Sequence, residues 1–132
     1  MPFLRNAWYI AAWAEEVTDG PIGRRLLDEK VVLYRLIDGT VVALEDRCCH
    51  RALPLSMGRM VGDRLQCGYH GLEYDQTGAC VNVPGQSTIP ADARIKSYPV
   101  IERYRWIWVW MGEPKRADPS SVPDFHWLDD PG

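Results

Sequence analysis

The 132-residue chain lacks several features that mark common classes of protein. No apolar run approaches the ~18 residues of a membrane span, and the start has neither the basic region nor the apolar stretch of a signal peptide. Positive charge is not in excess, because 15 Lys and Arg stand against 18 Asp and Glu, and no basic stripe for nucleic acid is present. We therefore expect a cytoplasmic protein that binds neither a membrane nor nucleic acid.

Histidine is scarce and cysteine nearly so, which makes their positions informative. The chain contains three histidines and four cysteines. In a cytoplasmic protein, cysteines serve more often as thiols or metal ligands than in disulfides. Cys48 and Cys49 are adjacent, and a bond between them would be strained. Cys80 lies among small and apolar residues, where we expect a buried or half-buried thiol.

What the chain does have is the pattern of an all-β domain, with short apolar runs bounded by turn residues. The expected strands are rich in β-branched and aromatic residues, and they cover residues 6–13, 25–27, 31–36, 40–45, 72–75, 79–83, 97–102 and 106–110. Asp38-Gly39 is a strong hairpin signal. A second hairpin is expected within 57–66, turning at Gly62-Asp63, and residues 84–92 are expected to form an irregular surface loop.

The end of the expected domain has a distinct composition. Residues 97–102 and 106–110 are predicted to form a final antiparallel pair, in which three tryptophans alternate with two aliphatic residues. This spacing puts the tryptophans on one face, and we interpret them as core packing rather than as a binding surface. The proline and polar content after Gly112 is typical of a linker. We therefore predict one domain at 1–112 and a linker at 113–132.

Two short clusters hold the residues that can bind a metal. Cys48 and His50 form C-x-H, Cys67 and His70 form C-x-x-H, and sixteen residues separate His50 from Cys67. Two sulfur and two nitrogen ligands suit a [2Fe–2S] centre in which cysteines hold one iron and histidines the other. A structural zinc site uses the same residue types. Zinc stays open on spacing alone, but each half-site here mixes one cysteine with one histidine, which favours the iron–sulfur centre.

The motif and its surroundings resemble a Rieske [2Fe–2S] domain. Further segments are similar to the N-terminal domain of Rieske non-haem iron oxygenases, in particular the vanillate demethylase, dicamba and toluenesulfonate mono-oxygenase group: residues 6–9, 51–56, 71–74, 95–99 and 106–110. The resemblance implies an all-β fold of three stacked antiparallel sheets, with the cluster held at the tip of two loops.

The resemblance also implies a role for each residue of the motif. Cys48 and Cys67 would hold the inner iron, and His50 and His70 the outer, more exposed iron. Cys49 occupies the middle of C-x-H and would not be a ligand.

The class of Rieske protein is indicated by one position in the second loop. Respiratory Rieske proteins carry a disulfide between the two loops, whereas this chain has Tyr69 at the corresponding position. The oxygenase or ferredoxin class is therefore expected, with a reduction potential toward the low end of the Rieske range of about −150 to +300 mV.

The activity implied by the resemblance is electron transfer. His126 is the only histidine outside the motif, so these residues cannot supply the two-histidine, one-carboxylate mononuclear iron site of such oxygenases. We expect the chain to accept single electrons from an NAD(P)H-dependent reductase or a ferredoxin and to pass them to a catalytic domain that it lacks, and toward which residues 113–132 lead. Oxygenases of this family are often trimeric and act on aromatic compounds.

Two other functions remain as alternatives. A free-standing Rieske-type ferredoxin would suit the length of the chain, and a structural zinc module would use the same four residues without redox chemistry. The chain is an oxidoreductase by resemblance, but no catalytic residue of its own is expected.

Overall fold

The computed structural model describes residues 6–49, 53–68, 71–85, 87–90 and 93–123. These residues form short strands and four single-turn 3₁₀ helices, and the described ranges contain no α-helix. The strands are β1 (Ala7–Trp13), β2 (Ile22–Leu26), β3 (Glu29–Arg35), β4 (Val41–Glu45), β5 (Arg59–Val61), β6 (Arg64–Gln66), β7 (Glu73–Tyr74), β8 (Cys80–Asn82), β9 (Ser97–Tyr98), β10 (Val100–Arg103) and β11 (Trp106–Met111). The 3₁₀ helices are η1 (Ala14–Glu16), η2 (Leu55–Met57), η3 (Pro114–Arg116) and η4 (Pro119–Ser121).

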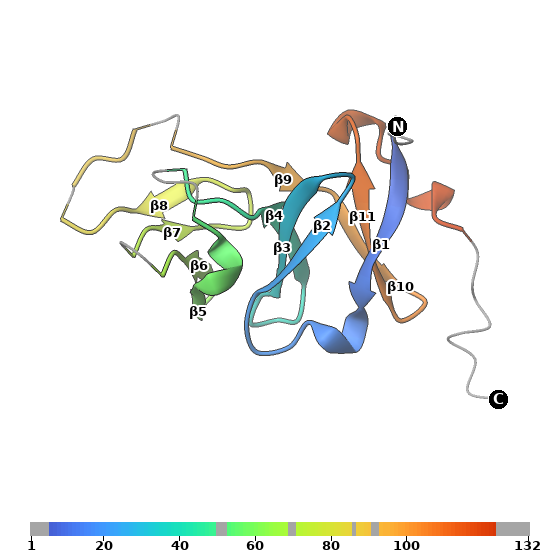
Figure 1. Cartoon of the computed structure of the whole chain (residues 1–132), viewed down its shortest axis with the longest axis horizontal. Helices are drawn as coiled ribbons and strands as arrows, with labels where there is room; N and C mark the ends of the chain where they lie inside the picture. Colours follow the sequence, from blue (N-terminus) through green and yellow to red (C-terminus); the bar gives the residue numbers. More distant parts are fainter. Residues whose placement is uncertain (1–5, 50–52, 69–70, 86, 91–92, 124–132) are drawn as a thin grey trace.

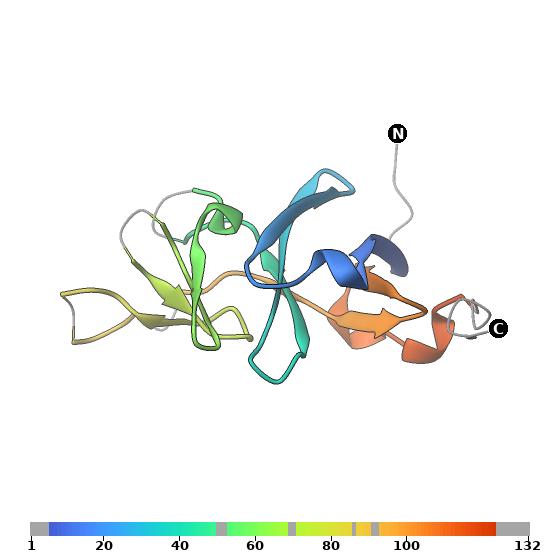
Figure 2. The same cartoon turned by 90° about the horizontal axis from the view of Figure 1, so that it is seen from below.

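Three antiparallel sheets follow one another along the long axis of the molecule, as both views show (Figures 1 and 2). Their strand orders are β1-β11-β10, β2-β3-β4-β9 and β5-β6-β7-β8, with β2-β3-β4-β9 in the middle. The all-β fold of three stacked antiparallel sheets expected from the sequence is confirmed.

The predicted hairpins form where the turn residues indicated them. Between β3 and β4, Gly39 has a φ of +94° and its N–H donates to the Leu36 carbonyl at 2.9 Å. Between β5 and β6, Gly62 has a φ of +63°. Glycine adopts such φ values without steric cost, so each of these glycines allows a tight turn in which one strand ends and the next begins.

The prediction for residues 97–102 was wrong in one respect, since they do not form a single strand. Ser97 and Tyr98 pair with β4 in the middle sheet, whereas Val100–Arg103 pair with β11 in the next. Pro99 lies between the two parts and has no N–H to donate to a ladder. Its carbonyl accepts from the Trp110 N–H at 2.9 Å, so the chain passes from one sheet to the other at this proline.

The strand β3 lies at the centre of the packing. Val31 and Leu33 belong to a core formed with β1, β10 and β11, while Val32 and Tyr34 belong to a second core formed with the sheet β5-β6-β7-β8. All four are fully buried. Because successive side chains point to opposite faces of a strand, one strand fills two cores.

The tryptophans of β11 lie on the face opposite the aliphatic core. Trp108 and Trp110 are buried, and the Trp110 ring packs edge-on against the ring of Trp8. The Trp8 Nε1 donates to the Asp118 carbonyl at 2.9 Å, which fastens the segment 113–123 onto β1.

In the described part of the chain, no helix has the length and apolar character needed to cross a membrane.

Candidate iron–sulfur site

Two loops of matching construction carry the described part of the motif. The first follows β4 and contains Cys48; the second follows β6 and contains Cys67. The Cys48 N–H donates to the Leu53 carbonyl at 2.9 Å, and the Cys67 N–H donates to the Leu72 carbonyl at 2.7 Å. Each cysteine thus closes its loop by a bond to the residue five positions later. The two motif residues therefore occupy equivalent places in two similar turns.

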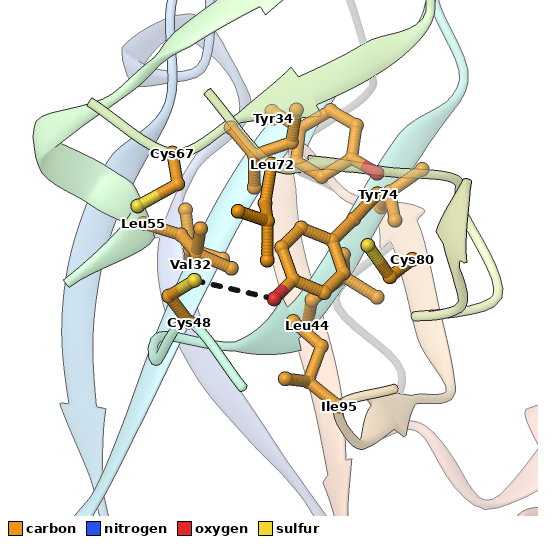
Figure 3. Packing of buried hydrophobic residues seen from close by; sticks show 12 residues of the cluster. Val32, Tyr34, Leu44, Cys48, Leu55, Cys67, Leu72, Tyr74, Cys80 and Ile95 are labelled. Carbon is orange, nitrogen blue, oxygen red and sulfur yellow. Dashed lines mark hydrogen bonds between the residues drawn. The ribbon is translucent and has the colours of Figure 1, made fainter. Parts of the chain in front are cut away.

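The sulfur atoms of both loops reach the same core. Cys48 is 2 % exposed and Cys67 is 4 % exposed, and both belong to the cluster of buried side chains that includes Leu55 and Leu72. Figure 3 shows the two cysteines at one edge of this cluster, on either side of Leu55. Folding therefore brings together two thiols that are 19 positions apart in sequence, since 67 − 48 = 19.

His50, His70 and Tyr69 lie outside the described residues. The structure therefore places two of the four predicted ligands, and it brings these two into one site.

Tyr74, a residue that the sequence analysis did not single out, lies beside the first cysteine pair. Its hydroxyl accepts a hydrogen bond from the Cys49 N–H at 2.8 Å and donates one to Cys49 Sγ at 3.0 Å. The same hydroxyl lies 3.3 Å from Cys48 Sγ (Figure 3). Burial raises the pKa of Tyr74 far above its ordinary value, so the hydroxyl is a donor at neutral pH. The feature of the sequence that could have pointed to Tyr74 is its position in a predicted short strand directly after the second loop.

The first loop is closed at its base by a buried carboxylate. Asp46 is 7 % exposed, and its oxygens accept from the Ser56 N–H at 2.7 Å and from the Ser56 Oγ–H at 2.6 Å. Gly23 of β2 faces this pair, and a Cβ at that position would lie 2.9 Å from Ser56 Oγ. The two ends of the loop that carries Cys48 are therefore joined by charge-assisted hydrogen bonds.

Glycines allow the second loop to pack tightly on η2. A Cβ on Gly58 would lie 2.0 Å from the Gln66 carbonyl oxygen, and one on Gly68 would lie 3.3 Å from the Met57 carbonyl oxygen. Gly71 has a φ of +77°, a left-handed conformation that suits glycine. The backbone of the second loop thus lies against η2 at a distance that larger residues would prevent.

The other two cysteines have different surroundings. Cys49 is half-buried and its sulfur faces the Tyr74 hydroxyl. Cys80 is 6 % exposed, lies beyond the Tyr74 ring in Figure 3, and has its pKa raised by burial. The expectation of a buried thiol at Cys80 is confirmed. All four cysteines are described, and none is in a disulfide.

The donors present fit an iron–sulfur centre. Cys48 and Cys67 offer two buried thiol sulfurs, and thiolates are the ligands that iron–sulfur clusters require. The model of the Rieske [2Fe–2S] domain family matches residues 7–99. The chain belongs to this family. A Rieske domain binds a [2Fe–2S] cluster, so the cofactor expected from the sequence is confirmed at the level of the family.

The similar proteins are oxygenase components. The chain is 54% identical over 130 residues to the iron–sulfur subunit of the toluene-4-sulfonate monooxygenase system of Comamonas testosteroni, covering 98% of this chain and 38% of that subunit. It is 51% identical over 132 residues to the oxygenase component of dicamba O-demethylase of Stenotrophomonas maltophilia, covering 99% of this chain and 39% of that protein. This Rieske domain therefore spans about two fifths of the length of these relatives.

The fold agrees closely with a solved relative. The crystal structure of apo dicamba monooxygenase superposes with a TM-score of 0.96 at 49% identity, covering 99% of this chain and 41% of that one. The family resemblance drawn from the motif is confirmed.

Proposed function

We propose that this Rieske domain is the electron-transfer part of an oxygenase component, and that it relays single electrons from a reductase to a mononuclear iron site held by a catalytic domain outside residues 1–132. The observation that carries the proposal is that Cys48 and Cys67, from two loops with the same hydrogen-bonded closure, are buried in one core.

The residues of the chain have separate roles in this proposal. The thiolates of Cys48 and Cys67 hold one iron, and the imidazoles of His50 and His70 hold the other. When bound, a [2Fe–2S] cluster supplies reversible one-electron chemistry. Leu55 and Leu72 exclude water from the sulfur ligands, being 0 % and 5 % exposed. In this structure the Tyr74 hydroxyl donates to Cys49 Sγ, and Cys48 Sγ lies 3.3 Å from the same hydroxyl. With Cys48 bound as a thiolate, its sulfur would be the stronger acceptor, so we assign the hydroxyl proton to Cys48 in the loaded site.

The remaining assignments follow from the relatives. We propose an aromatic compound as the substrate of the whole oxygenase, an NAD(P)H-dependent reductase or a ferredoxin as the electron donor, and the cytoplasm as the compartment, where thiols stay reduced. Residues 1–112 would form the electron-transfer domain and 113–132 the connection to the catalytic domain.

Alanine variants test the ligand assignment. Cys48→Ala, His50→Ala, Cys67→Ala and His70→Ala should each abolish the red-brown colour, because a Rieske cluster needs all four ligands. Cys49→Ala and Cys80→Ala should keep it, because their sulfurs hold no iron in this proposal. Visible absorption spectra of the purified variants, with iron and acid-labile sulfide contents, are the measurements.

Two results would count against the proposal. A colourless protein with stoichiometric zinc, purified without oxygen so that no cluster is lost, would favour the zinc module. Loss of colour in Cys49→Ala with retention in Cys48→Ala would show that the wrong sulfur has been assigned.

A further inference from the structure

Two carboxylates are buried in the described part of the chain, and each lies at the base of one ligand loop. Asp46 is 7% exposed and stands two positions before Cys48. Glu73 is 8% exposed and directly follows Leu72, whose carbonyl accepts from the Cys67 N–H at 2.7 Å. Burying a charge is costly unless it is paired. The partners of each carboxylate therefore indicate what its charge does at the site.

Glu73 has a counter-ion and faces away from the core. The Arg64 guanidinium lies 3.6 Å from Oε1 of Glu73, and Asn82 Nδ2 donates to its Oε2 at 2.8 Å. Tyr74, the next residue of β7, belongs to the core that contains both cysteines. Because successive side chains of a strand point to opposite faces, the Glu73 carboxylate lies on the other side of this sheet. Its charge is thus paired with a cation and directed away from the cysteines.

Asp46 has hydrogen-bond donors but no counter-ion among the described residues. Its oxygens accept from the N–H of Ser56 at 2.7 Å and from the Oγ–H of Ser56 at 2.6 Å, both of which are neutral donors. No Lys or Arg in the described ranges forms an ion pair with it. Gly23 of β2 lies close over the carboxylate, since a Cβ there would be 3.0 Å from Asp46 Oδ2. The base of the first loop therefore holds one negative charge that is shielded from solvent and not paired with a cation.

This charge lies close to both predicted sulfur ligands. Two peptide units span at most ~7 Å, which limits the distance between the Cα atoms of Asp46 and Cys48. Ser56, which binds the carboxylate, follows Leu55 in the chain, and the Leu55 side chain lies between Cys48 and Cys67 (Figure 3). The carboxylate is therefore on the order of 10 Å from a centre held by these two cysteines.

We propose that the charge of Asp46 lowers the reduction potential of the [2Fe–2S] centre, and that Asp46 thereby sets the equilibrium of the electron relay. This inference rests on the proposed function of the chain. One electron passes from the reductase, which is oxidised by one electron, to the centre, which is reduced by one and gains one negative charge. A fixed negative charge nearby opposes that gain. At an effective dielectric constant of about 20, a unit charge about 10 Å away changes such an equilibrium roughly tenfold.

The charge can be removed while the closure of the loop is kept. Asp46→Asn is isosteric, and its amide oxygen accepts from the Ser56 N–H while its amide nitrogen donates to the Ser56 hydroxyl oxygen. Spectroscopic redox titration of the cluster-loaded chain at neutral pH is the measurement. At a given potential, the ratio of reduced to oxidised centre should be about tenfold higher than in the wild type, which is a midpoint about 59 mV higher for a one-electron couple. Because the charge is buried, the shift should persist at high salt.

Three further variants separate the charge from the shape of the loop. Glu73→Gln makes the same change of charge at the other buried carboxylate and should leave the ratio within about twofold, because that charge is paired with Arg64. Ser56→Ala loosens the same closure and keeps the charge, so it should not raise the midpoint. Asp46→Ser is a second neutral variant with an oxygen that can accept from the Ser56 N–H. It should raise the midpoint as well, and it decides the matter if Asp46→Asn retains too little cluster to titrate.

The outcomes distinguish failure of this inference from failure of the proposed function. If the neutral variants of Asp46 titrate at the wild-type midpoint, or if Ser56→Ala raises the midpoint as much as they do, the charge of Asp46 does not set the potential, while the electron relay stands. A shift that disappears at high salt would contradict the assignment to a buried charge. If the loaded wild-type protein shows no reversible one-electron couple, the proposed function fails and this inference with it.

Discussion

Tyr74 connects the fold to the chemistry of the site at the scale of single residues. Its ring fills the core between the ligand loops and the middle sheet, and its hydroxyl reaches the sulfur of Cys48. A hydrogen bond to a coordinating thiolate, the role proposed for Cys48, is stronger when the cluster carries one more negative charge, so this contact would favour the reduced state. Tyr74 should therefore raise the reduction potential of the bound cluster.

Replacing Tyr74 by phenylalanine should lower the midpoint potential. A preference of about 1 kcal/mol for the reduced state corresponds to roughly 40 mV in a one-electron couple. Tyr34→Phe is a matched control, because the Tyr34 hydroxyl belongs to the same core, is buried, and has no hydrogen-bond partner among the described residues. Spectroscopic redox titration of both variants is the measurement; equal midpoints for Tyr74→Phe and the wild type would contradict the assigned role.

At the scale of elements, the two loops that carry Cys48 and Cys67 depend on a few hydrogen bonds for their shape, because their described residues form little regular secondary structure. Each is closed by the bond between its cysteine N–H and the carbonyl five positions later, and the first is closed again by Asp46 and Ser56. Removing the carboxylate of Asp46 would leave a half-buried N–H without its charged acceptor. The cost of such a loss is about 1–3 kcal/mol.

Asp46→Ala should therefore loosen the first loop and release the cluster faster. A cost of about 1.4 kcal/mol corresponds to a tenfold change, so the rate of bleaching in the presence of an iron chelator should rise roughly tenfold. Ser56→Ala keeps the bond from the backbone N–H and should show a smaller effect. Bleaching of both variants at the wild-type rate would show that this closure does not hold the loop.

The elements also show which parts of the structure sequence patterns can predict. Hairpins at Asp38-Gly39 and Gly62-Asp63 were predictable, because the residues that a tight turn requires are local. The passage of the chain from one sheet to the other at Pro99 was not predictable, because its pairing partners β4 and β11 are distant in sequence. The proline within the apolar run indicated only that the strand is interrupted there.

In the candidate site, too, some features were predictable from the sequence and others were not. The cysteines and their spacing were evident in the sequence, because ligand identity is a property of residue type. The contacts of Tyr74 with the cysteines and the closure of the first loop by Asp46 join residues far apart in sequence, and no pattern of neighbouring residues encodes them. His50 and His70 stay predictions, because they lie outside the described residues.

At the scale of the whole molecule, the three sheets form one continuous structure that carries the ligand loops at one end. The sheet β5-β6-β7-β8 lies at that end and the sheet β1-β11-β10 at the other (Figure 1). The strand β3 contributes to the cores on both sides of the middle sheet. Arg35 adds a link, since its guanidinium donates to Glu102 of β10 and to the Val17 carbonyl. The loops are thus carried by a framework that is packed on both faces of its middle sheet, and such a framework suits a site of fixed geometry.

The central claim is that this chain holds a [2Fe–2S] cluster with two cysteine and two histidine ligands. The most direct test is the electron paramagnetic resonance spectrum of the dithionite-reduced protein. Nitrogen ligation of one iron lowers the average g value, so we expect an average below that of four-cysteine ferredoxins. An average g equal to that of such ferredoxins, or a reduced protein with no signal and stoichiometric zinc, would contradict the claim.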